Sequence, residues 1–165
     1  MNNDGSISVR LSTVGAKIAA VAAALLLLAF AVAAVRWTFA RTVALRSPEI
    51  ELVEAAAAWA PSDPNVHLAL AQRLDRTFLP EDSARSLAEF ETAAALSPHD
   101  HLTWLYLGRA YERNGNTDAA ERALRTAAEL APQYAYVRWA LGNTLLRSGR
   151  VDEAFAEIRA AAAAD

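Results

Sequence analysis

The chain has 165 residues, enough for one domain, with 54% hydrophobic residues and a formal net charge of −3. It contains no cysteine, which excludes disulfides, thiol catalysis and metal sites with cysteine ligands. The first 46 residues carry a net charge of +4, whereas residues 48–165 contain 11 arginines against 18 acidic residues. An acidic body without a basic cluster repels phosphate groups, so nucleic-acid binding is not expected.

An uncharged apolar run of 18 residues extends over positions 18–35. As a helix with a rise of ~1.5 Å per residue it is ~27 Å long, close to the ~30 Å hydrocarbon core of a bilayer. Lys17 precedes the run, and Arg36, Trp37 and Arg41 follow it, as residues of membrane interfaces do. The sequence therefore predicts a short N-terminal tail over 1–16, a transmembrane helix over 17–40 and a juxtamembrane linker over 41–47.

A cleaved signal peptide is the alternative, because Ala31, Val32 and Ala33 offer small residues at a suitable spacing. The run is longer than the ~7–15 residues of a usual signal core and no polar region precedes that point, which favours an uncleaved anchor. Positive charges flank both ends of the run and do not decide its orientation. A short tail ahead of a first span favours a signal anchor, with the body on the extracytoplasmic (periplasmic) side.

The second half of the chain repeats itself at a period of 34 residues. Residues 101–134 align without a gap with residues 135–165, so that the pair 107–108 (Leu-Gly) falls on the pair 141–142 (Leu-Gly). Internal repetition at this period indicates a helical solenoid.

The pattern extends upstream in a weaker form. Residues 64–100 match a repeat with three extra residues in the turn, and residues 48–63 match the second half of another repeat. No strand is expected. The sequence predicts helices near 48–60, 64–76, 82–96, 101–114, 117–130, 135–148 and 151–163.

The repeats resemble the tetratricopeptide repeat (TPR) family, and the apolar run makes the chain similar to a single-pass, membrane-anchored bacterial member. The consensus positions are filled by Trp104, Leu107, Gly108, Tyr111, Ala120, Leu124, Ala127 and Pro132, and in the next repeat by Leu141, Gly142, Ala154 and Ile158. Leu124 stands where the consensus has Phe, and Arg138 stands where it has Trp. The resemblance implies an all-α fold over residues 48–165, a right-handed solenoid of antiparallel helix pairs preceded by one transmembrane helix.

The residue types at these positions agree with that fold. Gly108 and Ala120 are small where two antiparallel helices must cross closely, and Trp104, Tyr111 and Leu124 have the spacing of an apolar stripe between them.

No constellation of catalytic residues is found in the sequence. It has no phosphate-binding loop and no set of serine, histidine and acid, so an enzyme is not expected, nor is a cofactor. His99, Asp100 and His101 could be read as metal ligands, but they lie in a turn between repeats where Asp100 fits an N-cap. His67 occupies the position of Trp104 in the first repeat and is expected to pack rather than to act as a base.

In this family the first helix of each repeat lines a concave groove that binds peptides. Carried over by position, the resemblance implies a groove formed by Leu68, Gln72, Leu102, Leu105, Arg109, Tyr136, Trp139 and Asn143. Leu68, Leu105 and Trp139 hold equivalent positions and predict an apolar strip for a few hydrophobic anchors of a peptide. The basic and amide residues that some members use to hold a C-terminal carboxylate are not matched, because Leu68 and Leu105 occupy their places.

Two functions remain open from the sequence. The first is a non-enzymatic, membrane-tethered scaffold that binds a peptide or partner protein and supports assembly of an envelope or membrane complex. The second is a structural subunit that builds a homo-oligomer through its repeats and the helix at 151–163, because Asp165 precedes the position of the closing proline and no capping helix follows.

Overall fold

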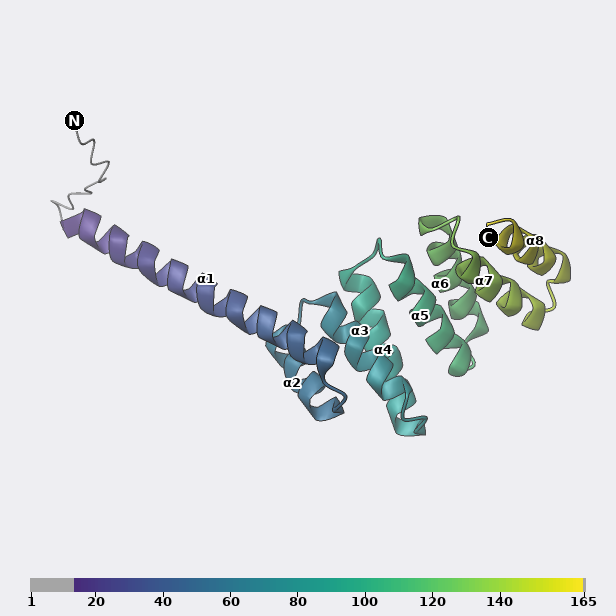
Figure 1. Ribbon diagram of the computed structural model, residues 1–165, viewed down its shortest axis with the longest axis horizontal. Coiled ribbons are helices and arrows are strands. Elements are labelled where there is room, and N and C mark those ends of the chain that lie inside the picture. Colours follow the sequence, from purple (N-terminus) through teal and green to yellow (C-terminus); the bar gives the residue numbers. More distant parts are fainter. Residues whose placement is uncertain (1–13, 165) are drawn as a thin grey trace, which may run out of the picture. The chain divides into compact units, whose positions relative to one another are not determined.

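The computed structural model describes residues 14–164, which form α-helices and, within that range, no strand (Figure 1). The helices expected from residue 48 onward begin and end within two residues of their predicted bounds, so the all-α prediction is confirmed. The helices are α1 (Val14–Arg46), α2 (Ile50–Trp59), α3 (Pro64–Asp75), α4 (Pro80–Leu96), α5 (His101–Arg113), α6 (Thr117–Leu130), α7 (Ala135–Arg147) and α8 (Val151–Ala163).

Helix α1 runs through two compact units of the chain, one that ends at Arg36 and one, the body, that begins at Trp37. In the first unit an 18-residue window has a mean hydropathy of 2.8, and none of it is buried. By length and composition this helix can cross a membrane, although an N-terminal signal sequence meets the same criterion. The predicted tail at 1–16 lies mostly outside the described residues, and its last three residues belong to α1.

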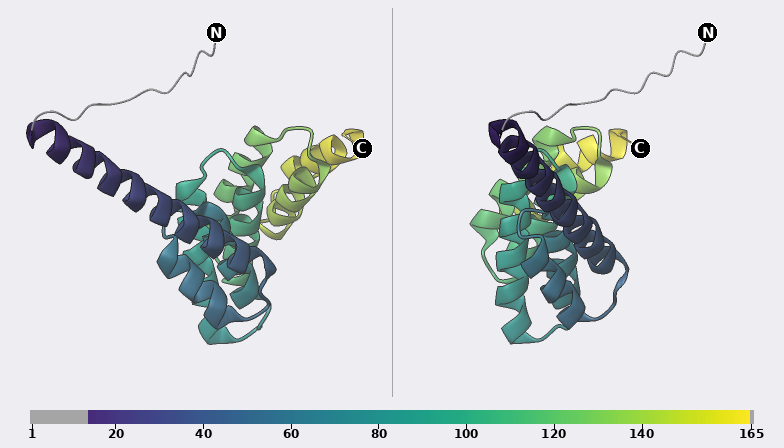
Figure 2. Two further views of the ribbon diagram at one scale, coloured as in Figure 1. Left: turned by 60° about the vertical axis from the view of Figure 1, so that its left-hand side comes forward. Right: turned by 90° about the vertical axis from the view of Figure 1, so that its left-hand side faces the viewer.

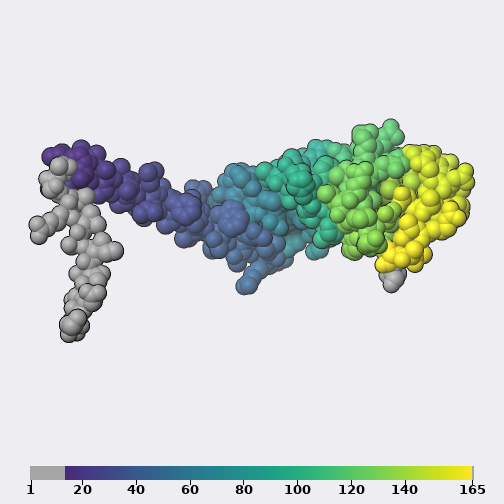
Figure 3. Space-filling model, turned by 90° about the horizontal axis from the view of Figure 1, so that it is seen from above, coloured from purple at the N-terminus to yellow at the C-terminus, as the bar shows by residue number. Residues whose placement is uncertain are grey.

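The body is a solenoid of helix pairs. Helices α3 and α4 pack against each other, as do α5 with α6 and α7 with α8, and the pairs are joined by contacts of α4 with α5 and of α6 with α7. The pairs lie side by side in chain order in Figure 2, and in the space-filling view they abut one another from teal to yellow (Figure 3). Each pair therefore contacts only its neighbours, which is the arrangement expected of a repeat protein.

Local sequence signals explain the helix ends. Asp63 caps α3 by accepting a hydrogen bond from the backbone N–H of Asn65 at 2.9 Å, and Asn116 caps α6 through the N–H of Ala119 at 3.1 Å. Gly115 adopts a positive φ of 74° in the turn between α5 and α6, a conformation that costs little without a Cβ.

The turn of the first pair differs because of its three extra residues. Phe78 adopts a φ of 57°, in the left-handed region that bulky residues rarely occupy, and its side chain is 89% exposed. The following residue, Leu79, precedes Pro80 at the first position of α4, where proline fits because its missing N–H would have no partner.

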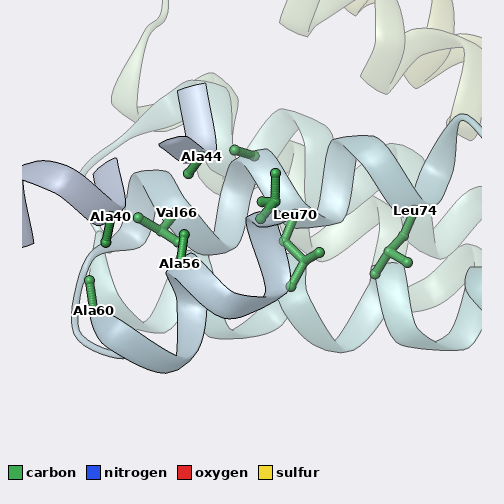
Figure 4. Close-up of a cluster of buried hydrophobic side chains, with 9 residues drawn as sticks. Ala40, Ala44, Ala56, Ala60, Val66, Leu70 and Leu74 are labelled. Carbon is green, nitrogen blue, oxygen red and sulfur yellow. The ribbon is translucent and has the colours of Figure 1, made fainter. Parts of the chain in front are cut away.

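The last turns of α1 belong to the hydrophobic core of the body, not to a linker. Ala40 and Ala44 are fully buried in one cluster with Val53 of α2 and Val66 of α3. Figure 4 shows the two alanines beside Ala56 and Val66. Residues 41–46, expected as a juxtamembrane linker, are helical. The physical reason is that small apolar side chains four residues apart form one helix face, and no helix breaker occurs before Pro48.

Glycines at equivalent positions allow the two helices of a pair to cross closely. A Cβ added at Gly108 would lie 2.7 Å from Cγ of Leu124, and one at Gly142 would lie 2.7 Å from Cγ1 of Ile158. Both distances are shorter than any ordinary carbon contact, so the spacing of α5 from α6 and of α7 from α8 depends on glycine.

Gly108→Ala should therefore destabilise the body even though alanine favours a helix. Overpacking against the buried Leu124 costs about 1–3 kcal/mol, against a gain of about 1 kcal/mol in helix propensity. Unfolding of the full chain in detergent micelles, followed by circular dichroism, measures the net loss. Gly15→Ala is the control, because a Cβ at Gly15 meets nothing within 4 Å; equal stability of the two variants would contradict the close crossing.

Candidate protein-binding groove

Two equivalent ion pairs, which we call the ladder, link the first helices of successive repeats, α3, α5 and α7. Asp75 on α3 pairs with Arg113 on α5 at 2.5 Å, and Glu112 on α5 pairs with Arg147 on α7. The two pairs are equivalent. Asp75 and Glu112 hold the same position in their repeats, and Arg113 and Arg147 hold the position that follows it in the next repeat. Glu112 also accepts a hydrogen bond from the hydroxyl of Thr144. The ladder marks one face that these three helices share.

Most of the predicted groove residues reach the surface. Leu102, Arg109, Tyr136 and Trp139 are exposed, whereas Leu68, Gln72 and Asn143 are partly buried. The rings of Tyr136 and Trp139 stack with their centroids 5.7 Å apart, and 50% of Trp139 is accessible. The side-chain amide of Asn143 donates to the carbonyl of Trp139 at 3.0 Å, one turn earlier on α7.

The prediction for Leu105 is wrong. Its side chain is 2% exposed and packs with Leu124, Val137 and Leu141 between neighbouring helices, so it is a core residue and cannot contact a peptide. The repeat position alone does not specify which way the side chain leans in this pair. The apolar part of the groove is consequently formed by the exposed Tyr136 and Trp139 rather than by a continuous strip.

A pocket of about 160 Å³ lies in the groove between α3 and α5. We call it the tyrosine pocket because Tyr106 lines it together with Phe90, and the two rings stack 6.2 Å apart. Polar groups from both first helices surround these rings. They are Gln72, Asp75, Arg76, Arg109 and Arg113.

A second pocket, of about 370 Å³, adjoins the first because Arg76 lines both. We call it the arginine pocket, since Arg46 and Arg73 line it as well, with Pro48, Ile50 and Thr77 completing its walls. This basic cluster could not be predicted from the sequence, because Arg46 lies 27 residues before Arg73 and belongs to another helix, α1. One signal could have revealed it. Arg76 is equivalent to Arg113 and Arg147, but the sequence before α3 has no acid at the position equivalent to Asp75 or Glu112.

The residues predicted to pack the repeats are mostly buried. Trp104, Tyr111 and Ile158 are partly buried and Pro132 is exposed. Trp104 packs against two of the core clusters, and so joins the core of one pair to the next. Fully or nearly fully enclosed are Leu107, Gly108, Ala120, Leu124, Ala127, Leu141, Gly142 and Ala154.

Comparison with known proteins agrees with this geometry. The family model described as tetratricopeptide repeat matches residues 81–135 and 107–165, which together cover more than half of the chain. The chain belongs to the tetratricopeptide repeat family. Its repeats thus form a scaffold for protein–protein interaction. A search of curated proteins gives no match.

Solved structures of MamA share the TPR fold of this chain. A crystal structure of MamA has a TM-score of 0.65 at 17% identity and covers 70% of this chain and 66% of its own. The structure MamA MSR-1 C2 has a TM-score of 0.61 at 22% identity and covers 70% of this chain and 65% of its own. The structure MamA AMB-1 P212121 has a TM-score of 0.62 at 23% identity and covers 70% of this chain and 67% of its own. At these identities the likeness concerns the fold alone. The chain spans about two thirds of the length of these proteins.

The TPR consensus tryptophan makes one hydrogen bond that all three repeats retain. Nε1 of Trp104 donates to the carbonyl of Pro98 at 2.9 Å, and Nε of Arg138, at the same position of the next repeat, donates to the carbonyl of Pro132 at 2.6 Å. In the first repeat, Nε2 of His67 lies 3.0 Å from the carbonyl oxygen six residues earlier. The replacement of the tryptophan therefore leaves the contact between successive repeats intact.

His67 is a positioned, charged packing residue. Its Nδ1 lies 2.6 Å from a carboxylate oxygen of Glu89, so with Nε2 on the carbonyl of Pro61 both ring nitrogens act as donors, as in the imidazolium form. The hydrogen bond to Glu89 is the largest cause that raises the pKa of His67, and it outweighs the opposing effect of burial.

Asp100 and His101, which the sequence places in a turn between repeats rather than at a metal site, are engaged in other contacts. Asp100 uses both carboxylate oxygens to cap α5, accepting from the backbone N–H groups of Leu102 at 3.2 Å and Thr103 at 3.3 Å. The ring of His101 packs edge-on against Tyr134, with the centroids 5.3 Å apart. Among residues 14–164 no group of three or more potential ligands is placed to hold a metal ion.

Stability of the body should fall as pH rises above the ordinary pKa of histidine. Because the pKa of His67 is raised in the folded state, its contribution is fully present below about pH 6.5 and is lost as pH rises through the folded-state value. Imidazole chemical shifts give this value directly. Glu89→Gln should lower the pKa of His67 and reduce the pH dependence of thermal unfolding; an unchanged pKa would show that the carboxylate does not hold the proton.

Proposed function

We propose that the chain is a membrane-tethered scaffold that binds a peptide or partner protein in the concave groove of its TPR repeats, in support of an envelope or membrane complex. The observation that carries the proposal is the stacked pair Tyr136 and Trp139, which stays accessible on α7 although aromatic rings of this size favour burial. Exposed aromatic side chains of this kind are frequent anchors at protein interfaces.

The tether is supported by residues around the apolar run as well as by the run itself. Trp37 and Phe39 are about half exposed, and the guanidinium of Arg41 lies 5.4 Å from the centre of the Trp37 ring. Phe39 contacts Trp59 of α2 with ring centroids 5.8 Å apart. Exposed aromatic rings with an arginine next to a long apolar helix are typical of the membrane–water interface. This combination favours a retained anchor over a cleaved signal sequence.

Trp139→Ala should weaken partner binding without unfolding the chain. Loss of a central aromatic anchor costs about 2 kcal/mol, or roughly a 30-fold weaker affinity. The full chain is cross-linked in membranes, and the recovery of each co-purified protein is compared between wild type and variant, with circular dichroism as the check on folding.

Phe155→Ala is the matched control, since it also removes a half-exposed ring but lies on α8, outside the groove. Recovery that depends on Phe155 and not on Trp139 would contradict binding in the groove.

A second candidate, self-association through α8, is favoured by one feature. Val151 and Phe155 lie one helical turn apart on α8 and are 48% and 53% exposed. An apolar pair of this kind can form a contact between two copies. The same Phe155→Ala variant distinguishes this candidate, because it should reduce the mass of the particle measured at several concentrations, whereas Trp139→Ala should not.

The body should lie on the extracytoplasmic side. A reporter that is active only outside the cytoplasm, fused after Asp165, is expected to be active, and a blot of the fusion should show the size of the uncleaved chain. An inactive reporter with an intact fusion would place the body in the cytoplasm, and a shortened fusion would indicate a signal sequence instead of an anchor.

A further inference from the structure

The ladder of ion pairs along the groove lacks one carboxylate at its N-terminal end. Arg113 and Arg147 each pair with an acid of the preceding first helix. Arg76 holds the corresponding position at the end of α3, but α1, the helix before the half repeat of α2, supplies Arg46 at the arginine pocket instead of an acid. The arginine at this position binds a carboxylate in the two following repeats, whereas Arg76 shares its pocket with another cation, Arg46.

The arginine pocket contains three guanidinium groups and no acidic side chain in its lining. Nε of Arg73 donates to the carbonyl of Ser47 at 3.2 Å, which fixes the direction of its guanidinium. Among the described residues, Arg46, Arg73 and Arg76 form no ion pair. Six other arginines of the body pair with acids, namely Arg85, Arg113, Arg125, Arg138, Arg147 and Arg150. Arg109, Arg122 and Arg159 are also without an ion pair within residues 14–164, but only Arg46, Arg73 and Arg76 line one pocket together with no acid in its lining. Three clustered cations without a counter-charge repel one another, and an anionic ligand relieves this repulsion.

We propose that the arginine pocket binds a carboxylate side chain of an acidic partner segment, which completes the ladder at Arg76. This proposal rests on the proposed function, since the segment continues from the pocket into the groove. Arg76 also lines the tyrosine pocket, where Arg109 and Gln72 present further donors beside Tyr106. Guanidinium groups bind carboxylates in a planar, two-bond geometry, which gives such a site direction as well as charge.

The charge of the whole body favours a short acidic peptide over an extended polyanion. From Trp37 onward the body has 18 acidic residues against 13 arginines, so a nucleic acid or an anionic membrane surface would meet repulsion over most of it. A peptide needs only the local positive potential of the two adjoining pockets. The ligand therefore has one or two acidic side chains, with an apolar residue next to them for the partly buried ring of Tyr106.

The first experiment selects peptides without assuming their sequence. The full chain in nanodiscs of neutral lipid is used to select from a random dodecapeptide phage library. We expect Asp and Glu to be enriched at least twofold over the unselected library. The double variant Arg46→Gln/Arg76→Gln should lose this enrichment. Arg122→Gln/Arg159→Gln should retain it, because it removes the same charge from two exposed arginines outside both pockets.

A selected peptide is then labelled with a fluorophore and titrated by anisotropy. The pocket double variant should bind it roughly tenfold or more weakly than the control double variant, and the difference should shrink in high salt. Arg46→Glu supplies the missing acid from within the chain, so it should also abolish binding while leaving the thermal unfolding midpoint unchanged or higher. Loss of binding together with a lowered midpoint would count against the proposal.

Three further results would overturn the proposal, and the first two of them leave the proposed function standing. If peptides bind and need Trp139 but show no acidic enrichment, the groove binds peptides and the arginine pocket does not select them. If glycerol phosphate competes for the pocket more tightly than the peptide, the pocket is a site for lipid headgroups. If no peptide is selected by the wild-type chain, the acidic-segment proposal fails and the groove function fails with it.

Discussion

Within each of the last two repeats, the two helices pack at a distance that only a small residue permits. Gly108 and Gly142 meet side-chain carbons of Leu124 and Ile158 where a Cβ would not fit. This spacing determines how far the next pair is displaced, and hence which side chains of α5 and α7 face the same direction. The ladder from Glu112 to Arg147 and the position of the groove residues follow from it. In the first pair, Ala71 takes the glycine position, and its carbonyl accepts a hydrogen bond from the hydroxyl of Ser86 at 2.9 Å.

The solenoid does not begin with a complete TPR helix pair. The end of α1 covers the N-terminal face of the body with Ala40 and Ala44, although nothing in the sequence of this segment resembles a repeat. An exposed apolar end face is a liability of repeat proteins. Here the segment that follows the apolar run covers it, and the same segment brings Arg46 to the groove. The end of α1 therefore both stabilises the N-terminal end of the body and forms part of the arginine pocket.

Sequence alone could predict the helices from α2 to α8, because the 34-residue period, the small crossing residues and the caps all agree. It could not predict the role of residues 41–46, since a helix of small apolar residues fits a linker as well as a core. The groove residues were predicted from their positions in the repeat, and this prediction is wrong for Leu105. Its burial depends on how its side chain packs against α7, which the repeat position does not specify. The arginine pocket was missed because Arg46, Arg73 and Arg76 come together only through the packing of α1 on α3.

The shared hydrogen bond at the tryptophan position has a consequence for how such arrays can change. Trp104, His67 and Arg138 differ in size and charge, yet each donates to a proline carbonyl of the preceding turn. A repeat can therefore exchange a neutral ring for a cation without losing the hydrogen bond to this carbonyl, and in both cases an acid, Glu89 or Glu157, pairs with the cation. Successive repeats can in this way differ in the side-chain charge at this position while they stack on one another in the same way.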